Sequence, residues 1–374
     1  MKFTILQSKL KEGLSVAERL SGKNLTLPIL NNVLITAKKN FLGLATTDLE
    51  SGIRWWSLAK IDEEGEIVTP AKILLDIIGY LPNKPIQFEV KEKFLQLECE
   101  NYKTNLKYFK NEEFPIIPEI KEVETVSIKS QVFCKGLNVV SNIPQPSPAR
   151  PEISGIYIGF QKNILKIAAT DSFRLGERKI TLEKALNSDY SLIIPQKTVK
   201  ELINIIGDKK GDLKIYISPN QIMFEFLMEE VEHPQFQLIS RLVEGEYPDY
   251  EGIIPKKHQT QIIAQKSELL NQIKGASVFS GKVSEIKLKI SSKKEKTEIT
   301  SQSPDLGEYQ SFLPSKISGE DIEVSFNFKY LSEGLLSIES SEIILDLNGK
   351  DGPGVLKPVG DLNYIYVVMP ININ

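Results

Sequence analysis

Short runs of alternating apolar and polar residues recur along the whole chain, a pattern typical of antiparallel β-strands with one buried face. Between these runs lie segments whose apolar residues are three and four positions apart, such as Leu10 and Leu14, which indicates amphipathic helices. Pro70 and Pro195 each stand at the start of such a segment, where a proline is well tolerated. The pattern predicts helices over 8–21, 71–80, 132–143, 196–206, 266–275 and 328–337.

The predicted elements form a repeat. A strand pair over 30–36 and 41–48 ends in Thr47-Asp48, and a second pair over 153–159 and 164–171 ends in Thr170-Asp171. A weaker third copy spans 286–290 and 297–301 and lacks the Thr-Asp pair. One helix precedes each pair, and a second helix and further strands follow it, at 86–90, 213–217 and 343–347. Self-similarity of this kind predicts three tandem copies of one α+β unit.

Two proline-containing stretches mark the ends of the first and second copies. Phe114-Pro115 with Pro118 resembles Tyr247-Pro248 with Pro255, and both read as linkers. We therefore expect domains over 1–120, 121–254 and 255–374, which is an ordinary domain size.

The composition is that of a globular protein and argues against a membrane-spanning one. Of 374 residues, 41% are hydrophobic and 25% charged, which is usual for a globular protein, and no apolar run is long enough to span a membrane. The N-terminal apolar run ends at Gln7 and is too short for a signal peptide, so we expect a cytoplasmic protein. The two cysteines, Cys99 and Cys134, are expected to be buried, and the two histidines, His233 and His258, to be solvated loop residues. We expect no metal site and no cofactor.

Charge is distributed unevenly. The whole chain has a net charge of −3, which excludes a uniformly basic nucleic-acid binder. The predicted helices nevertheless carry ten basic and six acidic residues, a net charge of +4. If the helices share one face, that face is mildly positive and attracts phosphate groups without reading base sequence. Lysines that merely solvate exposed helix faces remain the alternative explanation.

Several short strings, in order along nearly the whole chain, resemble the bacterial DNA polymerase III beta subunit family, the DNA sliding clamps. They are Met1-Lys2-Phe3, Leu27-Pro28-Ile29-Leu30, Thr47-Asp48-Leu49-Glu50, Ala169-Thr170-Asp171-Ser172-Phe173-Arg174-Leu175, Tyr247-Pro248-Asp249-Tyr250 and Tyr366-Val367-Val368-Met369-Pro370. The resemblance implies three DNA-clamp domains, each with two helices packed on antiparallel sheets, and a head-to-tail homodimer that closes a six-domain ring. Double-stranded DNA would pass through the ring, and the protein would be a processivity factor rather than an enzyme.

The resemblance also implies partners and site residues. The replicative polymerase, the clamp loader and repair polymerases would dock through short peptides in a groove between the second and third repeats; no membrane partner is implied. An apolar groove with an adaptable methionine can take a Leu or Phe anchor. The implied groove residues are Ile153, Thr170, Arg174, Leu175, Pro248, Ile253, Val367, Met369, Pro370 and Ile371. The implied DNA-facing residues are Lys23, Arg150, Lys197 and Lys200, and the implied dimer contact is formed by Leu106, Val278 and Phe279.

Two other classes of function were weighed. An enzyme is disfavoured because Gly275 to Gly281 has the wrong spacing for a phosphate-binding loop, and Asp48 and Asp171 fit ordinary Asx turns. The other alternative is a repeat scaffold that binds proteins only, without encircling DNA.

Overall fold

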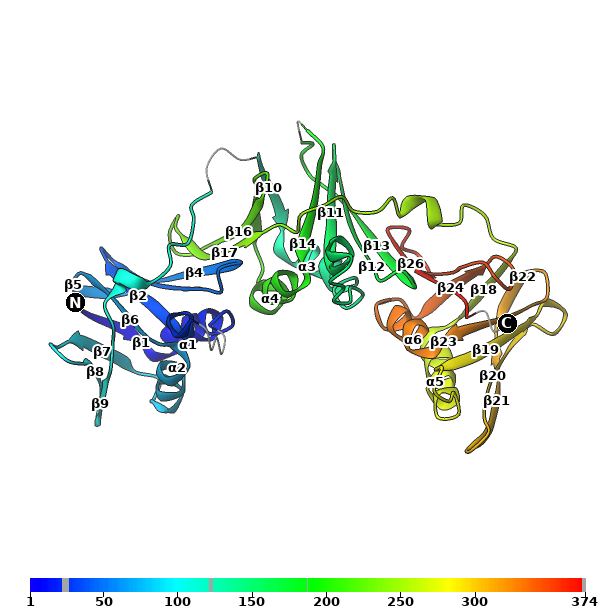
Figure 1. The fold of residues 1–374 in the computed structure, drawn as a ribbon, viewed down its shortest axis with the longest axis horizontal. Coiled ribbons are helices and arrows are strands. Elements are labelled where there is room, and N and C mark those ends of the chain that lie inside the picture. Colours follow the sequence, from blue (N-terminus) through cyan, green and yellow to red (C-terminus); the bar gives the residue numbers. More distant parts are fainter. Residues whose placement is uncertain (22–26, 121–123, 187, 372–374) are drawn as a thin grey trace. The chain divides into compact units, whose positions relative to one another are not determined.

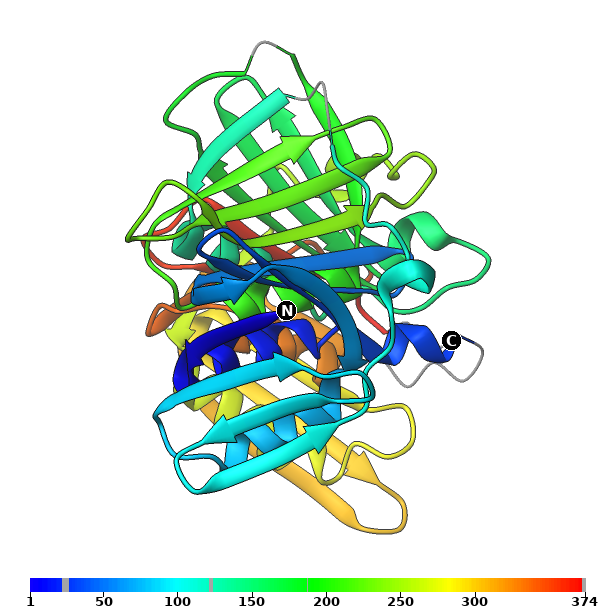
Figure 2. The same cartoon turned by 90° about the vertical axis from the view of Figure 1, so that its left-hand side faces the viewer.

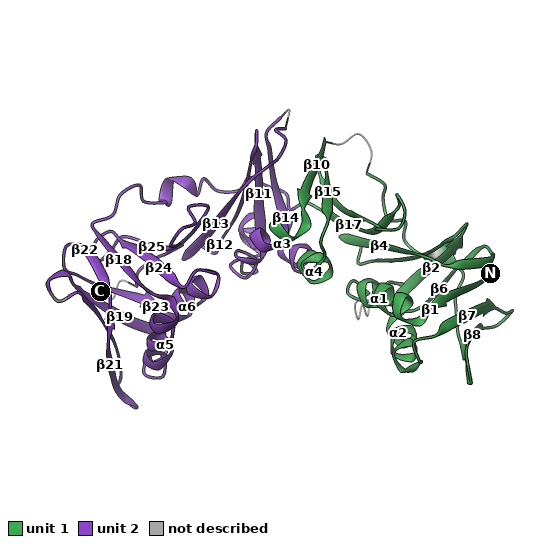
Figure 3. Cartoon of the chain, turned by 180° about the vertical axis from the view of Figure 1, so that it is seen from behind, with its two compact units in different colours: residues 1–132, 201–242 green, residues 133–200, 243–374 purple. Residues whose placement is uncertain are grey.

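The structure is a computed structural model, and it describes residues 1–21, 27–120, 124–186 and 188–371. The chain forms two compact units (Figure 3), and each is described by itself. Unit 1 comprises residues 1–132 and 201–242, and unit 2 comprises residues 133–200 and 243–374. All strand pairs in the described residues are antiparallel, as the alternating pattern predicts.

Unit 1 contains two sheets. The smaller one, formed by dark blue and cyan strands at the front of Figure 2, has the order β5-β1-β7-β8-β9, and the larger one has the order β10-β15-β16-β17-β4-β3-β2-β6. The strands of the smaller sheet are β1 (Lys2–Leu6), β5 (Lys60–Glu63), β7 (Pro85–Val90), β8 (Leu95–Cys99) and β9 (Tyr102–Leu106). Those of the larger sheet are β2 (Asn32–Lys38), β3 (Phe41–Thr47), β4 (Ser51–Leu58), β6 (Gly65–Pro70), β10 (Glu124–Lys129), β15 (Asp212–Ile217), β16 (Gln221–Leu227) and β17 (Pro234–Arg241).

Unit 2 also contains two sheets (Figure 1). The larger has the order β14-β11-β12-β13-β26-β25-β24-β18-β22, and the smaller has the order β21-β20-β19-β23. The strands of the larger sheet are β11 (Gly155–Gln161), β12 (Ile164–Thr170), β13 (Arg174–Thr181), β14 (Tyr190–Pro195), β18 (Thr260–Gln265), β22 (Lys316–Gly319), β24 (Glu342–Leu347), β25 (Gly354–Pro358) and β26 (Tyr364–Val368). Those of the smaller sheet are β19 (Glu285–Ser291), β20 (Lys296–Ser303), β21 (Gly307–Pro314) and β23 (Ile322–Asn327).

In each unit the larger sheet joins strands from two sequence repeats. In unit 1, β17 pairs with β4, and Ile239 lies opposite Gly52. In unit 2, β26 pairs with β13, and Val367 lies opposite Leu175. Backbone hydrogen bonds therefore run across the repeat boundaries predicted from the sequence.

The six predicted helices are all present in the described residues. They are α1 (Gln7–Ala17), α2 (Ala71–Tyr80), α3 (Ser130–Asn138), α4 (Gln196–Ile206), α5 (Lys266–Ser277) and α6 (Phe328–Leu336). The prediction for 71–80 is confirmed, whereas α1 and α3 end earlier than predicted and continue as hydrogen-bonded turns. Close packing sets α1 against its sheet, because Gly13 leaves room for the ring of the buried Trp55.

Three local expectations need correction or confirmation. Leu30 and Ile153, predicted at strand starts, lie in the 3-10 helices η1 (Pro28–Asn31) and η3 (Pro151–Ser154), because a proline in the first position sets the helical φ. His233 is half-buried and stacks on Phe41 with ring centroids 4.0 Å apart, so the expectation of a solvated residue was wrong. Cys99 and Cys134 are buried and unpaired, as predicted. No described helix is long and apolar enough to cross a membrane.

Candidate functional site

The turn from β12 to β13 forms the centre of the predicted peptide site. Thr170 Oγ1 donates to the Arg174 carbonyl at 2.8 Å, and Asp171 Oδ1 accepts from the backbone N–H groups of Phe173 and Arg174. Ser172 takes a positive φ of 75° within this turn. The aspartate is thus the Asx-turn residue expected from the sequence, and it shapes the turn.

The first repeat builds the same turn from β3 to β4. Thr47 Oγ1 donates to the Ser51 carbonyl at 2.7 Å, and Asp48 Oδ1 accepts from the N–H groups of Glu50 and Ser51. Leu49 has the same φ of 75° as its counterpart. The internal repeat therefore extends to individual hydrogen bonds, but Ser51 stands where the second repeat has Arg174.

The side chain of Arg174 is buried and forms ion pairs with other residues of the chain. The side chain is only 3% exposed, and its Nε lies 2.9 Å from Asp171 Oδ2. Another guanidinium nitrogen reaches Glu333 of α6 at 2.5 Å, and the group lies over the ring of Tyr330 at 4.6 Å. Burial lowers the pKa of Arg174, but Tyr366, Glu333 and Asp171 outweigh burial and raise it overall. Arg174 therefore ties β13 to α6 and stays charged.

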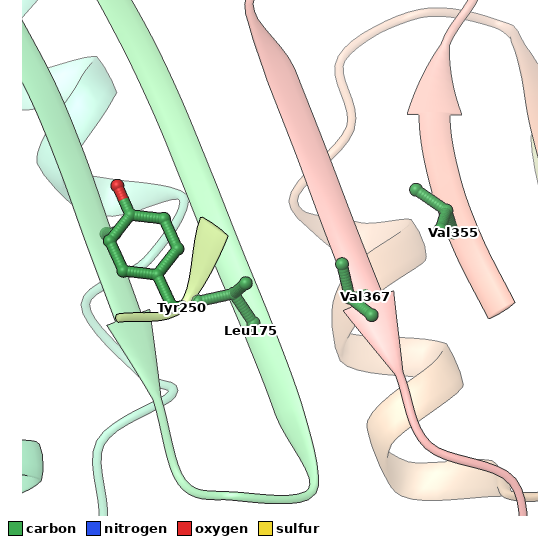
Figure 4. Packing of buried hydrophobic residues seen from close by; sticks show 5 residues of the cluster. Leu175, Tyr250, Val355 and Val367 are labelled. Carbon is green, nitrogen blue, oxygen red and sulfur yellow. The ribbon is translucent and has the colours of Figure 1, made fainter. Parts of the chain in front are cut away.

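Strand pairing brings several predicted peptide-site residues together. Leu175 lies opposite Thr170 on β12 and opposite Val367 on β26. Leu175 and Val367 belong to a buried cluster with Ala168, Tyr250 and Val355. Figure 4 shows Leu175, Val367 and Val355 on strands and Tyr250, which is not on a strand, beside Leu175. The backbone N–H of Met369 donates to the Phe173 carbonyl at 2.9 Å.

The remaining predicted peptide-site residues lie on three segments: η3, the linker before β18 and the residues after β26. Pro248 stands between Tyr247 and Tyr250, and Ile253 ends the 3-10 helix η4 (Glu251–Ile253). Ile153 is buried in η3, and Pro370 is half-buried. Ile371 donates its N–H to the Ser325 carbonyl of β23 at 2.8 Å. The site's apolar residues are therefore in part core and in part surface.

Exposed apolar side chains point to one residue, Phe173, that is not among the predicted peptide-site residues. Ile253 is 53% exposed and Met369 is 39% exposed, and Phe173 in the central turn is 59% exposed. The Phe173 ring stacks on Tyr330 of α6 with centroids 6.2 Å apart. The available sequence signal was only the place of Phe173 in the Thr170–Leu175 motif, because its contact with Tyr330, 157 residues further along the chain, is not visible in the sequence.

The predicted DNA-facing residues fall in different places. Lys23 lies outside the described residues. Lys197 and Lys200 are on α4, the former exposed and the latter half-buried. Arg150 is exposed; it pairs with Glu152 at 3.3 Å and donates to Ser172 Oγ at 3.3 Å, so it lies beside the central turn of the peptide site.

The predicted dimer residues lie at or near sheet edges. Leu106 is half-buried on β9, which is an edge of the five-stranded sheet of unit 1. In unit 2, Val278 is exposed directly after α5. Phe279 stacks on Tyr309 of β21, an edge of the four-stranded sheet, with centroids 6.4 Å apart. Edge strands of this kind are ready to pair with another chain.

Comparison with solved structures defines the class of protein. The fold matches a DNA polymerase sliding clamp from Bacillus subtilis with a TM-score of 0.93 at 26% identity, covering 100% of both chains. A Pseudomonas aeruginosa sliding clamp bound to griselimycin matches with a TM-score of 0.93 at 24% identity, again over 100% of both chains. The chain therefore has the three-domain architecture of the DNA sliding clamps.

Sequence comparison then gives the family. Models of the N-terminal, central and C-terminal domains of the DNA polymerase III beta subunit match residues 1–118, 127–249 and 251–372. The beta sliding clamp of Staphylococcus aureus is 28% identical over 381 residues, 99% of each chain, and that of Staphylococcus epidermidis is equally similar. The chain belongs to the DNA polymerase III beta subunit family. It is a non-catalytic processivity clamp of DNA replication, and the protein-only scaffold is not favoured.

Proposed function

We propose that two copies of this chain close a head-to-tail ring around double-stranded DNA and that the ring works in the cytoplasm. The proposal assigns three clamp domains to residues 1–120, 121–254 and 255–374. The observation that carries it is the match of all three repeats, end to end, to sliding clamps. A closed ring is retained on DNA by topology, so individual phosphate contacts can be weak enough to permit sliding.

The charges of the helices support a loose electrostatic contact. The six helices carry nine lysines and five carboxylates. Three of these carboxylates are paired with cations from outside the helices: Glu12 with Lys209, Glu201 with Arg19 and Glu333 with Arg174. Two helical lysines are likewise paired with carboxylates outside the helices, Lys9 with Glu230 and Lys135 with Glu339. Outside these pairs the helices keep seven lysines and two carboxylates, which suits sequence-independent attraction to phosphates. We propose that Lys23, Arg150, Lys197 and Lys200 face the DNA and contribute to this attraction.

The ring closure is proposed to use Leu106 from one chain and Val278 and Phe279 from the other. Leu106 lies on the edge strand β9, and Phe279, after α5, stacks on Tyr309 of the edge strand β21; pairing β9 with β21 of a second copy would cover both edges. Leu106→Asp places a charge at this contact without opening the core, because the side chain is half-buried. Ile116→Asp is the matched control, because Ile116 is 94% exposed and lies outside the proposed contact.

The test is retention on DNA. The protein is loaded on nicked circular DNA with a clamp loader and ATP, the DNA is linearised, and release is followed. We expect slow loss from circles and fast loss from linear DNA for the wild type and Ile116→Asp. Leu106→Asp is expected to be monomeric by light scattering and to be lost quickly from both forms. Equal loss of a dimeric wild type from circles and linear DNA would refute encirclement.

We further propose that the ten peptide-site residues form a docking surface for short peptides of the replicative polymerase, the clamp loader and repair polymerases. Support comes from the apolar cluster that contains Leu175 and Val367 and from two exposed apolar side chains, Met369 directly after β26 and Ile253 in the linker before β18. An apolar surface with an adaptable methionine fits a Leu or Phe anchor. The griselimycin complex of the Pseudomonas aeruginosa clamp makes griselimycin a useful second probe.

A further inference from the structure

One wall of the proposed peptide site is formed by a segment without sheet pairing. Residues 243–259, all of them described, contain η4 and no strand. This segment carries Pro248 and Ile253, two of the proposed peptide contacts. Backbone hydrogen bonds fix only its ends, from Val243 to the Ile193 carbonyl and from Gln259 to the Leu347 carbonyl. Within the segment, Glu251 of η4 pairs with Lys166 of β12, and the question is which side chains fix the stretch around Pro248.

The first anchor is Tyr250. Its ring is buried against Leu175 and Val367, and its hydroxyl donates to Glu177 Oε2 at 2.8 Å. Glu177 is itself buried on β13 and has one further partner in Lys179 Nζ at 3.2 Å. Burial and the Glu177 carboxylate raise the pKa of Tyr250, so the hydroxyl stays protonated and keeps donating. A buried carboxylate that loses a donor is strongly disfavoured, which favours the docked linker.

The second anchor is Tyr247. The backbone N–H of Thr170, at the central turn, donates to the Tyr247 hydroxyl at 3.0 Å. Burial raises the pKa of Tyr247, so it too remains a neutral phenol. Tyr157 of β11 contacts both anchors, with ring centroids 5.2 Å from Tyr247 and 5.8 Å from Tyr250. The two anchors therefore attach the linker to the sheet on either side of Pro248.

We propose that Tyr247, Tyr250 and Glu177 are positioning residues, which hold the linker on the sheet so that Pro248 and Ile253 are in place before a peptide arrives. The inference rests on the proposed peptide-docking function. If the linker detached part of the time, only the docked fraction would bind, and the apparent Kd would rise by the inverse of that fraction. The expected signature is slower association with unchanged dissociation, because the bound complex is the same.

The test compares hydroxyl deletion with a matched control. Tyr250→Phe keeps the packed ring and removes the hydrogen bond to Glu177. Tyr216→Phe removes a Tyr–Glu hydrogen bond of the same 2.8 Å length, to Glu225, in the large sheet of unit 1. Glu177→Gln retains an acceptor for Tyr250, whereas Glu177→Leu does not. Binding of a fluorescein-labelled hexapeptide ending in Leu-Phe, and of griselimycin, is measured by stopped flow and anisotropy.

We expect Tyr250→Phe and Glu177→Leu to lower the docking equilibrium constant of the linker about tenfold, the worth of one such hydrogen bond. Peptide binding should weaken severalfold, by at most that factor, with the loss in the association rate. Tyr216→Phe and Glu177→Gln should stay within about threefold of the wild type. If Tyr250→Phe binds the probes as tightly as the wild type does, the positioning role is overturned and the peptide-docking function is not. A Tyr250→Phe loss confined to the dissociation rate also overturns it. A wild type that binds neither probe refutes the peptide-docking function itself.

Discussion

Replacing Arg174 by methionine tests whether one buried cation holds β13 to α6. Methionine has a similar length but cannot pair with Asp171 or Glu333. The Asp171 side chain is only 4% exposed, so it would be left buried without its cationic partner, whereas Glu333 is 46% exposed and would be hydrated. The Arg174–Asp171 pair is therefore expected to contribute much more to the stability around β13 and α6 than the Arg174–Glu333 pair.

The magnitude follows from burial. Breaking a buried pair by removing one partner costs about 3–5 kcal/mol. Asp171 keeps its two backbone N–H donors, so we expect Arg174→Met to cost less, about 2–3 kcal/mol. Glu333→Gln removes only a half-exposed charge and keeps an acceptor, so we expect about 0.5 kcal/mol.

The assay is hydrogen exchange measured by mass spectrometry on peptides from β13 and α6. At about 1.4 kcal/mol per tenfold change, Arg174→Met should lower protection there about 30- to 100-fold, and Glu333→Gln about twofold. Peptides from β1 and β7 of unit 1 serve as the internal reference. Equal effects of the two substitutions, or a loss below about fivefold for Arg174→Met, would refute the assignment of the stability to the buried pair.

Two further predictions concern packing and thiol chemistry. Gly13→Ala should destabilise the protein by about 1–3 kcal/mol, because its Cβ would lie 2.4 Å from the buried Trp55 ring. Gly79→Ala, with nothing within 4 Å of its Cβ, should instead stabilise α2 by about 0.5 kcal/mol; calorimetry that gives both changes the same sign would contradict this reading. Burial raises the pKa of Cys134 to about 12, so the native thiol should resist iodoacetamide at pH 8 and react faster as the pH rises. Rapid labelling of native Cys134 at pH 8, at the rate seen in urea, is the result that would argue against its burial.

Periodicity in the sequence predicted the repeated elements well, because the signal for each helix and strand is local. The 71–80 and 196–206 helices match the structure at both ends. Errors arose where a proline started a 3-10 turn, at Pro28 and Pro151, since such a turn has no apolar period of its own. The half-buried His233 was also missed, because its stacking partner Phe41 is far away in the chain.

The candidate site could be predicted only in part, and for a physical reason. Motifs identified Thr170, Leu175 and Val367 as neighbours, and strand pairing bears that out. Side-chain direction was not predictable: Arg174 was expected in the peptide groove, yet its guanidinium is buried against Asp171 and Glu333. The hydrogen bond from Tyr250 to Glu177 forms only because the linker crosses the face of β13 on which Glu177 lies. The sequence around either residue does not indicate which face the linker crosses.

The pairing of strands from different repeats affects how the chain is made on the ribosome. Gly52 of β4 has no pairing partner on one side until Ile239 is synthesised, and Leu175 of β13 has none on one side until Val367 is synthesised. At about 5–20 residues per second, the roughly 190 residues between the partners take about 10 to 40 seconds to synthesise. Throughout that interval one side of each nascent strand has no ladder partner and can bind a neighbouring nascent chain. Slow translation, or crowding of ribosomes on one message, should therefore lower the yield of folded protein even though the finished fold is unaffected.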